Sequence, residues 1–254
     1  MQIYPVIVTY NRACEDSPSC MALLRQGRPA LIVDNSTRDC GNETFCREKG
    51  WEYLNMHGNA GISRAYNAAL EQLRGRDGLV VWLDDDTELN EEYFAALEQA
   101  AQEDTQAEVF LPLVVSLGNQ ENILSPCLYG KYKMRRAESC EALRGHALSA
   151  INSGMAVRLR VYESYRYDES LFLDYVDHDF MAMCREKGMR IHVLEQTRLY
   201  QNFSGDSRPR YQQAMTRYNI FEKDFRTFGK KHGLSPMMVR LLLAYKKRQI
   251  KRKQ

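Results

Sequence analysis

The chain has 254 residues, of which 44% are hydrophobic and 27% are charged, and its formal net charge is +2. These values are typical of a globular domain, and no apolar run approaches the roughly 20 residues of a membrane span. The N-terminus lacks a signal-peptide pattern and the seven cysteines form no Cys-x-x-Cys pair, so we expect a cytosolic protein with free thiols.

Charge is unevenly distributed along the chain. Six of the eight residues at 246–253 are Lys or Arg, and the remainder is slightly acidic. This pattern argues against a nucleic-acid-binding surface and for one local electrostatic contact. The preceding segment, 236–245, predicts a helix with an apolar side. That side either packs on the body of the protein, or residues 237–254 lie on an anionic membrane surface.

The first ninety residues alternate between short apolar runs and helical segments. Strands are predicted at 3–10, 29–33, 51–54 and 80–83, and helices at 61–73 and 90–103. This alternation predicts right-handed βαβ units and a mostly parallel sheet. The carboxyl ends of such strands converge on one edge, where α/β proteins bind ligands. The polar residues expected there are Thr9, Asn11, Asp34, Asn35, Asp84 and Asp86.

The second half of the chain is less regular. A strand is predicted at 109–115, strand character resumes around a turn at 150–157, and a final strand is predicted at 189–194. A helix is expected to end at Gly188, and two more helices are predicted at 209–229 and 236–252. Residues 116–150 are too punctuated by Gly, Asn and Pro for an assignment.

Two acidic clusters are candidate chemical groups. Asp84, Asp85 and Asp86 follow a buried strand, and closely spaced oxygen ligands suit Mg²⁺ or Mn²⁺. The alternative is that they solvate a loop and cap the helix near residue 90. Asp174 and Asp177 are three residues apart at the expected start of a helix, where both would face one cleft and one could act as a general base. The alternative is ordinary placement of acids at a helix N-terminus.

A third candidate is the loop 59–61, which opens the helix 61–73. Backbone amides at such a helix start form an anion site when glycine allows close approach, and Arg12 and Arg64 could add positive charge. The alternative is a turn with an asparagine cap.

Seven motifs, in this order and spacing, resemble family 2 glycosyltransferases, and the later ones resemble the bacterial rhamnosyltransferase-like branch. The motifs lie at residues 8–12, 33–37, 59–67, 84–87, 152–154, 169–180 and 217–219. The resemblance implies an α/β fold of the GT-A type, a Rossmann-like, mostly parallel sheet flanked by helices, with C-terminal helices. It implies a catalytic domain at 1–205, divided into a nucleotide-sugar half (1–115) and an acceptor half (116–205), and a helical extension at 206–254.

The same resemblance implies roles for individual residues. Asp34 would read the nucleotide base, Asp84 and Asp86 would bind Mn²⁺ or Mg²⁺, and Asp177 would be the general base. Residues expected on the nucleotide and donor side are Thr9, Asn11, Arg12, Asp34, Asn59, Gly61, Arg64, Asp84 and Asp85. Residues expected near the acceptor or the donor sugar are Asn152, Ser153, Gly154, Asp174 and His178.

One departure from the family pattern concerns the metal. Members often carry a histidine after the last strand, whereas residues 199–205 contain none, so that Gln201, Asn202 or water would replace it. The function implied is inverting, metal-dependent sugar transfer from a UDP- or dTDP-linked donor to a glycan or lipid-linked acceptor in surface polysaccharide synthesis. It would take place at the inner membrane face.

Two alternatives stay open at this point. A sugar nucleotidyltransferase could share the acidic strand ends, but it would be expected to have a glycine-rich, basic loop after the first strand, and residues 11–14 do not form one. A membrane-attached binding module with a non-catalytic site would use the basic tail and would not need the acids.

Overall fold

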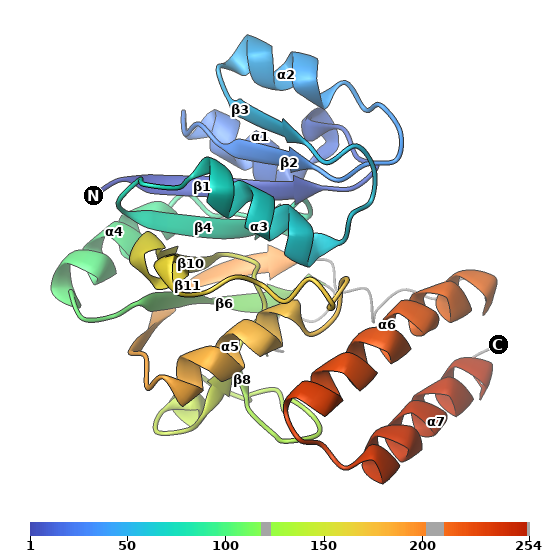
Figure 1. The fold of residues 1–254 in the computed structure, drawn as a ribbon. Helices are drawn as coiled ribbons and strands as arrows, with labels where there is room; N and C mark the ends of the chain where they lie inside the picture. The colour runs from blue at the N-terminus through green and yellow to red at the C-terminus, as the bar shows by residue number, and fades with distance from the viewer. Residues whose placement is uncertain (118–122, 202–210, 253–254) are drawn as a thin grey trace.

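The computed structural model describes residues 1–117, 123–201 and 211–252, and within them a nine-stranded sheet forms the centre of the molecule (Figure 1). The strand order is β3-β2-β1-β4-β10-β6-β11-β5, and β7 pairs with β6. The strands of this sheet are β1 (Ile3–Thr9), β2 (Leu31–Asp34), β3 (Glu52–Asn55), β4 (Leu79–Asp84), β5 (Thr87–Glu88), β6 (Val109–Ser116), β7 (Ile123–Ser125), β10 (Met155–Arg158) and β11 (Ile191–Gln201). The short strands β8 (Cys127–Leu128) and β9 (Leu148–Ser149) form a separate pair.

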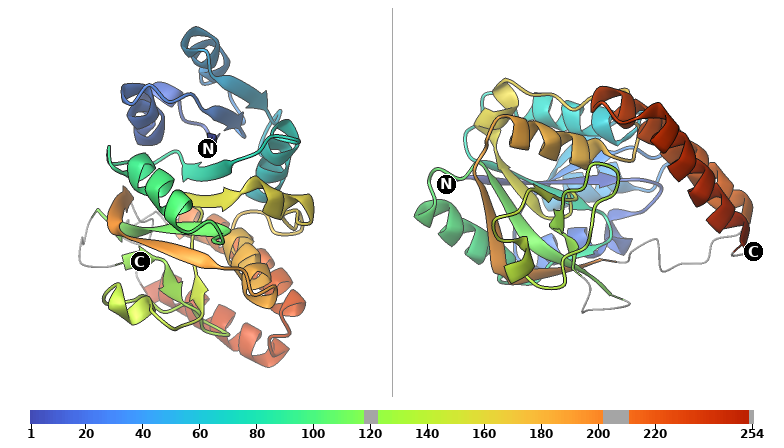
Figure 2. Two further views of the ribbon diagram at one scale, coloured as in Figure 1. Left: turned by 90° about the vertical axis from the view of Figure 1, so that its left-hand side faces the viewer. Right: turned by 90° about the horizontal axis from the view of Figure 1, so that it is seen from below.

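Helices cover both faces of this sheet (Figure 2). They are α1 (Pro18–Arg25), α2 (Asn42–Lys49), α3 (Ile62–Gln72), α4 (Tyr93–Glu103), α5 (Val176–Glu186), α6 (Tyr211–Lys231) and α7 (Pro236–Arg252). Alternate residues of β4 enter different cores: Trp82 packs with α3, α5 and α6, whereas Val81 and Leu83 pack with α1, α2 and α4. A strand buried on both faces requires a continuous apolar run, which explains why residues 79–83 show no polar alternation.

The strand order creates a switch point between β1 and β4. From β1 the chain proceeds outward to β2 and β3, and then returns through α3 to place β4 on the other side of β1. These four strands are parallel, with Val8 beside Asp84 and Thr9 beside Asp34. Open parallel sheets bind ligands at the carboxyl end of such a switch point. The predicted α/β architecture and the convergence of these acids on one edge are therefore confirmed.

The structure corrects the predicted limits of the last strand. β11 continues to Gln201, well beyond the predicted end at residue 194, and its pairing with β6 is interrupted between Leu194 and Arg198. Glu195, Gln196 and Arg198 are exposed, because β11 lies next to the sheet edge and pairs with β5 only at its end. These polar residues obscured the strand signal. α2 was also not predicted, since its sequence is dominated by polar residues.

The helices α6 and α7 form an antiparallel hairpin whose inner side belongs to the main core. The Tyr218 hydroxyl donates to the Leu243 carbonyl at 3.0 Å, and Val239 packs against Gly229. The apolar side of α7 is divided: Leu242 packs against the body, whereas Leu241 and Tyr245 are exposed. Within the described ranges, none of the helices has both the length and the apolar character needed to cross a membrane.

Candidate active site

Asp34 lies at the end of β2, where surrounding donors fix its carboxylate. Its Oδ1 accepts the Ser36 backbone N–H at 3.0 Å, and its Oδ2 accepts the Asn42 amide and the Tyr53 hydroxyl, both at 3.1 Å. The Thr9 hydroxyl lies 3.5 Å from Oδ1. With 6% of its surface exposed and donors on both oxygens, the Asp34 carboxylate is held in one orientation.

The loops after β1 and β2 interlock beside Asp34. Asn11 adopts a left-handed backbone conformation with φ 54°, its N–H donates to Ser36 Oγ at 2.8 Å, and its Oδ1 accepts the Thr37 N–H at 3.0 Å. Two recesses of about 680 and 420 Å³ open at these loops. Asn11 and Arg12 line the first, and Asp34 and Thr37 line the second.

The loop before α3 does not form the expected anion site. The Ala60 N–H donates to Asn35 Oδ1 at 2.8 Å, the Gly61 N–H to Asn59 Oδ1 at 3.2 Å, and the Ile62 N–H to the Phe172 carbonyl at 2.7 Å. All three amides are thus engaged by the protein itself. A Cβ on Gly61 would lie 2.7 Å from Phe172 Cδ2, so this glycine permits a close approach of protein to protein.

The two arginines proposed to support that site also have partners in the protein. Arg64 forms an ion pair with Glu169 at 3.3 Å, with both side chains at least half exposed. Arg12 lies 3.6 Å from the carboxylate of Asp85 and donates to the Asp85 carbonyl at 3.3 Å. Arg12 therefore remains beside the acidic turn, whereas Arg64 faces the loop that contains Glu169.

Serines of α1 and its N-cap hold the acidic turn after β4. Ser19 Oγ lies 2.5 Å from the Asp84 carbonyl and 2.8 Å from the Thr87 carbonyl, and Ser17 Oγ donates to the Asp85 carbonyl at 2.6 Å. These contacts engage backbone carbonyls and therefore leave the three carboxylates to partners on other elements. None of them caps α4, which begins at Tyr93 without a side-chain cap, so the capping alternative is wrong.

Gln201 bridges the two outer acids of the turn. Its Nε2 donates to Asp84 Oδ2 at 2.8 Å and to Asp86 Oδ1 at 3.0 Å. Ser153, in the turn before β10, donates to Asp84 Oδ2 and lies 3.0 Å from Gln201 Oε1. The end of β11 thus places an amide where the family pattern has a histidine, and the alternative candidate, Asn202, lies outside the described residues.

These groups are suitable ligands for a hard divalent cation. Asp84, Asp86 and Gln201 offer oxygen ligands, because the amide presents either its NH₂ or its oxygen after a half-turn of its last bond. Among the described residues, no cluster of three or more His, Cys, Asp or Glu side chains could hold a metal. Mg²⁺ is commonly bound by one or two carboxylates together with substrate phosphates, so two acids and an amide are sufficient.

The raised pKa of Asp84 predicts pH-dependent metal binding. Burial, together with the neighbouring Asp86 and Asp85, raises the pKa of Asp84 to about 6. Protons and metal compete for this carboxylate, so we expect Mn²⁺ affinity to fall about tenfold per pH unit below about 6. Titration of Mn²⁺ into protein with a nucleotide sugar, whose diphosphate diester does not titrate here, measures this. Equal affinities at pH 7 and pH 5 would contradict it.

The second acidic cluster differs in geometry from the prediction. α5 begins at Val176, and Tyr175 before it has a left-handed φ of 67°, so Asp174 lies outside the helix and the i,i+3 argument does not apply. Asp174 forms a two-pronged ion pair with Arg217. Asp177 lies in the first turn of α5, where burial raises the pKa of its carboxyl. Asp177 is therefore the better base of the two.

A third acid, Asp179, also lies in the first turn of α5 and is structural. It is 2% exposed and pairs with Lys231 and His232, both at 2.8 Å. The His178 side chain contacts β9 instead, with its Nδ1 2.7 Å from Ser149 Oγ. The backbone N–H of His178 donates to the Asp177 carboxylate at 2.7 Å. The buried carboxylate thus fastens α5 to α6, and the histidine lies beside the candidate base.

Tyr66 is under the electrostatic influence of both acidic groups. This buried residue of α3 has a pKa raised well above its usual value, first by burial and then by Asp84 and Asp177, while the Asn152 amide acts in the opposite sense. Both carboxylates therefore act on one phenol, although they are 93 residues apart in the sequence. Asn152 Oδ1 is buried and lacks a hydrogen-bond partner among the described residues, which is uncommon for a buried polar atom.

Gly154, by contrast, has a packing role. Its φ is 77°, and a Cβ would collide with the Leu199 side chain, so only glycine fits the turn that presents Asn152 and Ser153.

Sequence reasoning missed the residues that orient the acids, since single hydroxyls and aromatics carry no motif. They are Ser17 and Ser19, which hold the backbone of the acidic turn, and Tyr53, which donates to Asp34.

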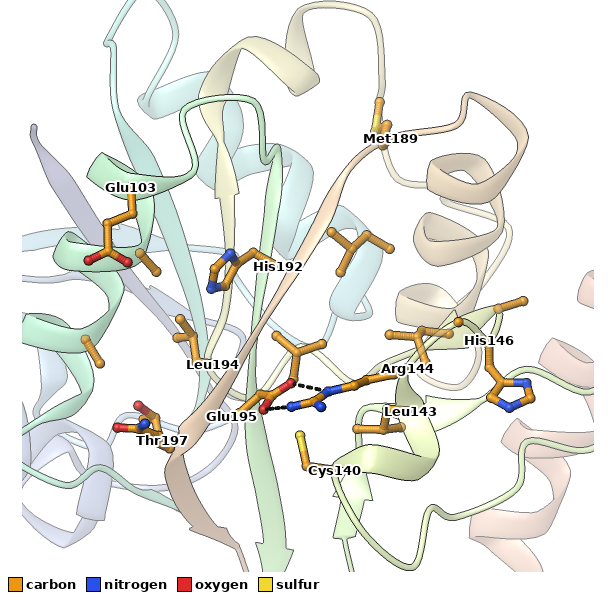
Figure 3. Close-up of a pocket in the computed structure, with 18 of the residues that line it drawn as sticks. Glu103, Cys140, Leu143, Arg144, His146, Met189, His192, Leu194, Glu195 and Thr197 are labelled. Carbon is orange, nitrogen blue, oxygen red and sulfur yellow. Dashed lines mark hydrogen bonds and ion pairs between the residues drawn. The ribbon is translucent and has the colours of Figure 1, made fainter.

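A larger cavity than these two recesses lies elsewhere. It measures about 1020 Å³ and is lined by α4, β11 and residues 140–148, and none of the candidate site residues faces it. Figure 3 shows the ion pair of Arg144 with Glu195 beside it, with Nη2–Oε2 at 2.6 Å. This cavity lacks the acids that converge at the switch point. It is therefore not the candidate reaction site, despite its size.

Comparisons with known proteins concern the family and the fold. The model of the family "Glycosyl transferase family 2" matches residues 6–188. The dTDP-rhamnosyl transferase RfbF of Shigella flexneri is 24% identical over 199 residues, which are 76% of this chain and 66% of that protein. The chain therefore spans just under two thirds of this relative.

Solved structures share the fold. TarS of S. aureus has a TM-score of 0.58 and 17% identity, over 90% of this chain and 40% of that one. The mannosyltransferase PcManGT of Pyrobaculum calidifontis, in complex with GDP-Man and Mn²⁺, has a TM-score of 0.59 and 14% identity, over 90% of this chain and 64% of that one. Identities this low concern the fold alone, and the predicted GT-A-like architecture is confirmed. Since the family model covers most of the chain, the chain belongs to glycosyl transferase family 2.

Proposed function

We propose that the protein is an inverting, metal-dependent glycosyltransferase that uses a nucleoside-diphosphate sugar. The observation that carries this is the pairing of Asp84 and Asp86 through Gln201, together with Asp177, whose carboxylate acts on the same buried phenol of Tyr66 as Asp84 does. A leaving diphosphate and an attacking hydroxyl need such groups on opposite sides of the anomeric carbon. A single displacement between them inverts that centre and needs no enzyme nucleophile.

The donor side of this scheme uses the loops after β1, β2 and β4. Asp34 accepts a hydrogen bond from the nucleotide base, while the recesses at Asn11 and Arg12 hold the nucleotide. Asp84, Asp86 and Gln201 would hold a divalent ion, which stabilises negative charge on the departing diphosphate when it is bound. Asn152, whose buried Oδ1 has no partner among the described residues, is assigned to the donor-sugar side.

The acceptor side uses the start of α5. Asp177 takes the proton from the acceptor hydroxyl as that oxygen attacks. The raised pKa of its carboxyl makes it a stronger base than an exposed aspartate. Asp174 is neutralised by Arg217, so it does not compete for that proton. His178, held by Ser149, borders the same place and is available to an acceptor hydroxyl.

A donor panel tests this function. The protein is incubated with Mn²⁺, octyl glycosides as acceptors, and dTDP-rhamnose, UDP-glucose, UDP-galactose or GDP-mannose, and release of the nucleoside diphosphate is followed. Because the relative RfbF is a dTDP-rhamnosyl transferase, dTDP-rhamnose is the first donor to test. Turnover of at least one donor that stops with a chelator supports the proposal. A protein that binds donors but never releases diphosphate, even with added glycan or lipid-linked acceptors, would be a binding module.

The acceptor is proposed to be a glycan or lipid-linked sugar at an anionic membrane surface, as in surface polysaccharide synthesis. Met237, Leu241 and Tyr245 lie four residues apart on α7, and between 57% and 67% of each side chain is exposed. Arg248 and Arg252 continue the same side of this helix and are exposed. Arg240 and Lys247 are exposed next to that side. An apolar stripe bordered by cations suits the interface of a bilayer that contains acidic lipid.

Neutralising this basic segment is expected to abolish membrane attachment. Each cation near an acidic leaflet contributes roughly 1 kcal/mol, so replacing Lys247, Arg248, Lys251 and Arg252 by Gln should weaken binding by several kcal/mol. Sedimentation with vesicles containing phosphatidylglycerol measures this, and added salt should release the wild type. Vesicles of phosphatidylcholine alone are the control. If the variant sediments as the wild type does, then the segment is not the anchor.

A further inference from the structure

The helix α6 carries a buried carboxylate directed at the loop before the candidate base. Asp224 is 0% exposed. Its Oδ1 accepts the Phe172 N–H at 3.0 Å, and its Oδ2 accepts the N–H groups of Leu173 and Asp174, both at 2.8 Å. Three backbone donors on one buried carboxylate fix both the position and the direction of that backbone.

The same loop is also held from α3. The Phe172 carbonyl accepts the Ile62 N–H at 2.7 Å, and the Leu171 carbonyl accepts the Ser63 hydroxyl at 2.5 Å. The carbonyls of residues 171 and 172 therefore bond to α3, and the N–H groups of residues 172–174 bond to α6. The loop has little freedom to shift while both sets of bonds are present.

Tyr175 completes this arrangement. Its φ of 67° is unusual for a residue with a side chain, so its conformation has to be imposed by packing. Its ring lies 5.2 Å from that of Phe225 and 4.7 Å from that of Phe228, both on α6. The left-handed residue turns the chain directly into α5, and Asp177 follows two residues later.

We propose that Asp224 is a positioning residue for sugar transfer, because it fixes the loop 172–175 and thereby the place of the Asp177 carboxylate. This inference rests on the proposed function of Asp177. Asp224 itself contacts backbone amides, and its effect on the reaction passes through the loop. The nucleotide side is built on β1, β2 and β4, so Asp224 should influence turnover and leave nucleotide binding unchanged.

The test compares Asp224→Asn with Asp168→Asn. The first substitution keeps the shape of the side chain but replaces one acceptor oxygen with an NH₂ that opposes the N–H groups of the loop. Asp168→Asn removes an ion pair with Lys231, at the end of the same helix, without touching those amides, and serves as a control for lost stability. Misplacing a reacting group by about 1 Å can cost about 10²-fold. We therefore expect kcat to fall about 10- to 100-fold in Asp224→Asn, with the Kd for nucleotide and Mn²⁺ within about twofold of wild type.

Hydrogen exchange gives a readout independent of turnover. The amides of residues 172–174 should exchange faster in Asp224→Asn and remain protected in Asp168→Asn. Should Asp224→Asn not fold, Asp224→Glu retains the charge and displaces the carboxylate by one methylene, and it should lower kcat in the same direction.

Three results distinguish a failure of this inference from a failure of the proposed function. If Asp177→Asn retains full activity, the assignment of the base fails. If Asp177→Asn is inactive while Asp224→Asn turns over as the wild type does, the positioning role alone is overturned. Equal losses of kcat in Asp224→Asn and Asp168→Asn, at equal loss of stability, would reduce Asp224 to a stabilising residue.

Discussion

Replacing Asp177 by Asn is expected to reduce sugar transfer by about 10²- to 10⁴-fold while nucleotide and metal binding persist. The reason is that this carboxylate takes the proton of the acceptor hydroxyl, and an amide of the same shape cannot. Asp177 lies in the first turn of α5, and the nucleotide loops lie at the ends of β1, β2 and β4. Binding and chemistry should therefore separate. Steady-state rates, with calorimetry of nucleotide binding, measure both quantities.

The pH profile provides a second test of the same residue. Because burial raises the pKa of the Asp177 carboxyl, the acidic limb of kcat/KM should lie above the range of an exposed aspartate in the wild type and disappear in the variant. Glu186→Gln, an exposed change of the same charge on the same helix, is the control. A residual rate within about threefold of wild type would show that the base lies elsewhere, with Asp174 the next residue to test.

Replacing Asp86 by Asn should abolish metal-dependent binding of the nucleotide sugar while leaving the fold intact. Asp86 and Asp84 are the two acids bridged by Gln201, and Asp86 is partly exposed, so its loss removes a ligand without opening the core. Without a second carboxylate the ion is held by Asp84 and an amide alone. We expect the affinity for Mn²⁺ to fall at least about 100-fold, and turnover to fall with it.

Calorimetric titration of Mn²⁺ in the presence of the nucleotide sugar measures this loss. Glu88→Gln makes the same change of charge on the exposed side of β5, two residues away, and should bind Mn²⁺ as the wild type does. Equal thermal unfolding of both variants without metal would show that the turn is intact. If Asp86→Asn binds metal with wild-type affinity, the acidic turn has no part in the mechanism.

The sequence by itself determined that the first strands are parallel and which polar residues lie at their carboxyl ends. Short apolar runs separated by helices dictate right-handed connections, and these bring the ends of β1, β2 and β4 together. Thr9, Asp34 and Asp84 therefore meet as predicted. Local periodicity contains this information because strands buried on both faces must be apolar throughout.

Only the tertiary structure decided how the acids are held and which of them are available. The Asp174 carboxylate looks equivalent to that of Asp177 in the sequence, yet Arg217 of α6 neutralises it, and Asp179 is buried against Lys231. Gln201 reaches Asp84 across 117 residues of sequence. Such contacts depend on side chains brought together by folding, and no spacing along the chain encodes them. The loop at Gly61 shows the same limit: its amides resembled an anion site, but Asn35, Asn59 and Phe172 accept their hydrogen bonds.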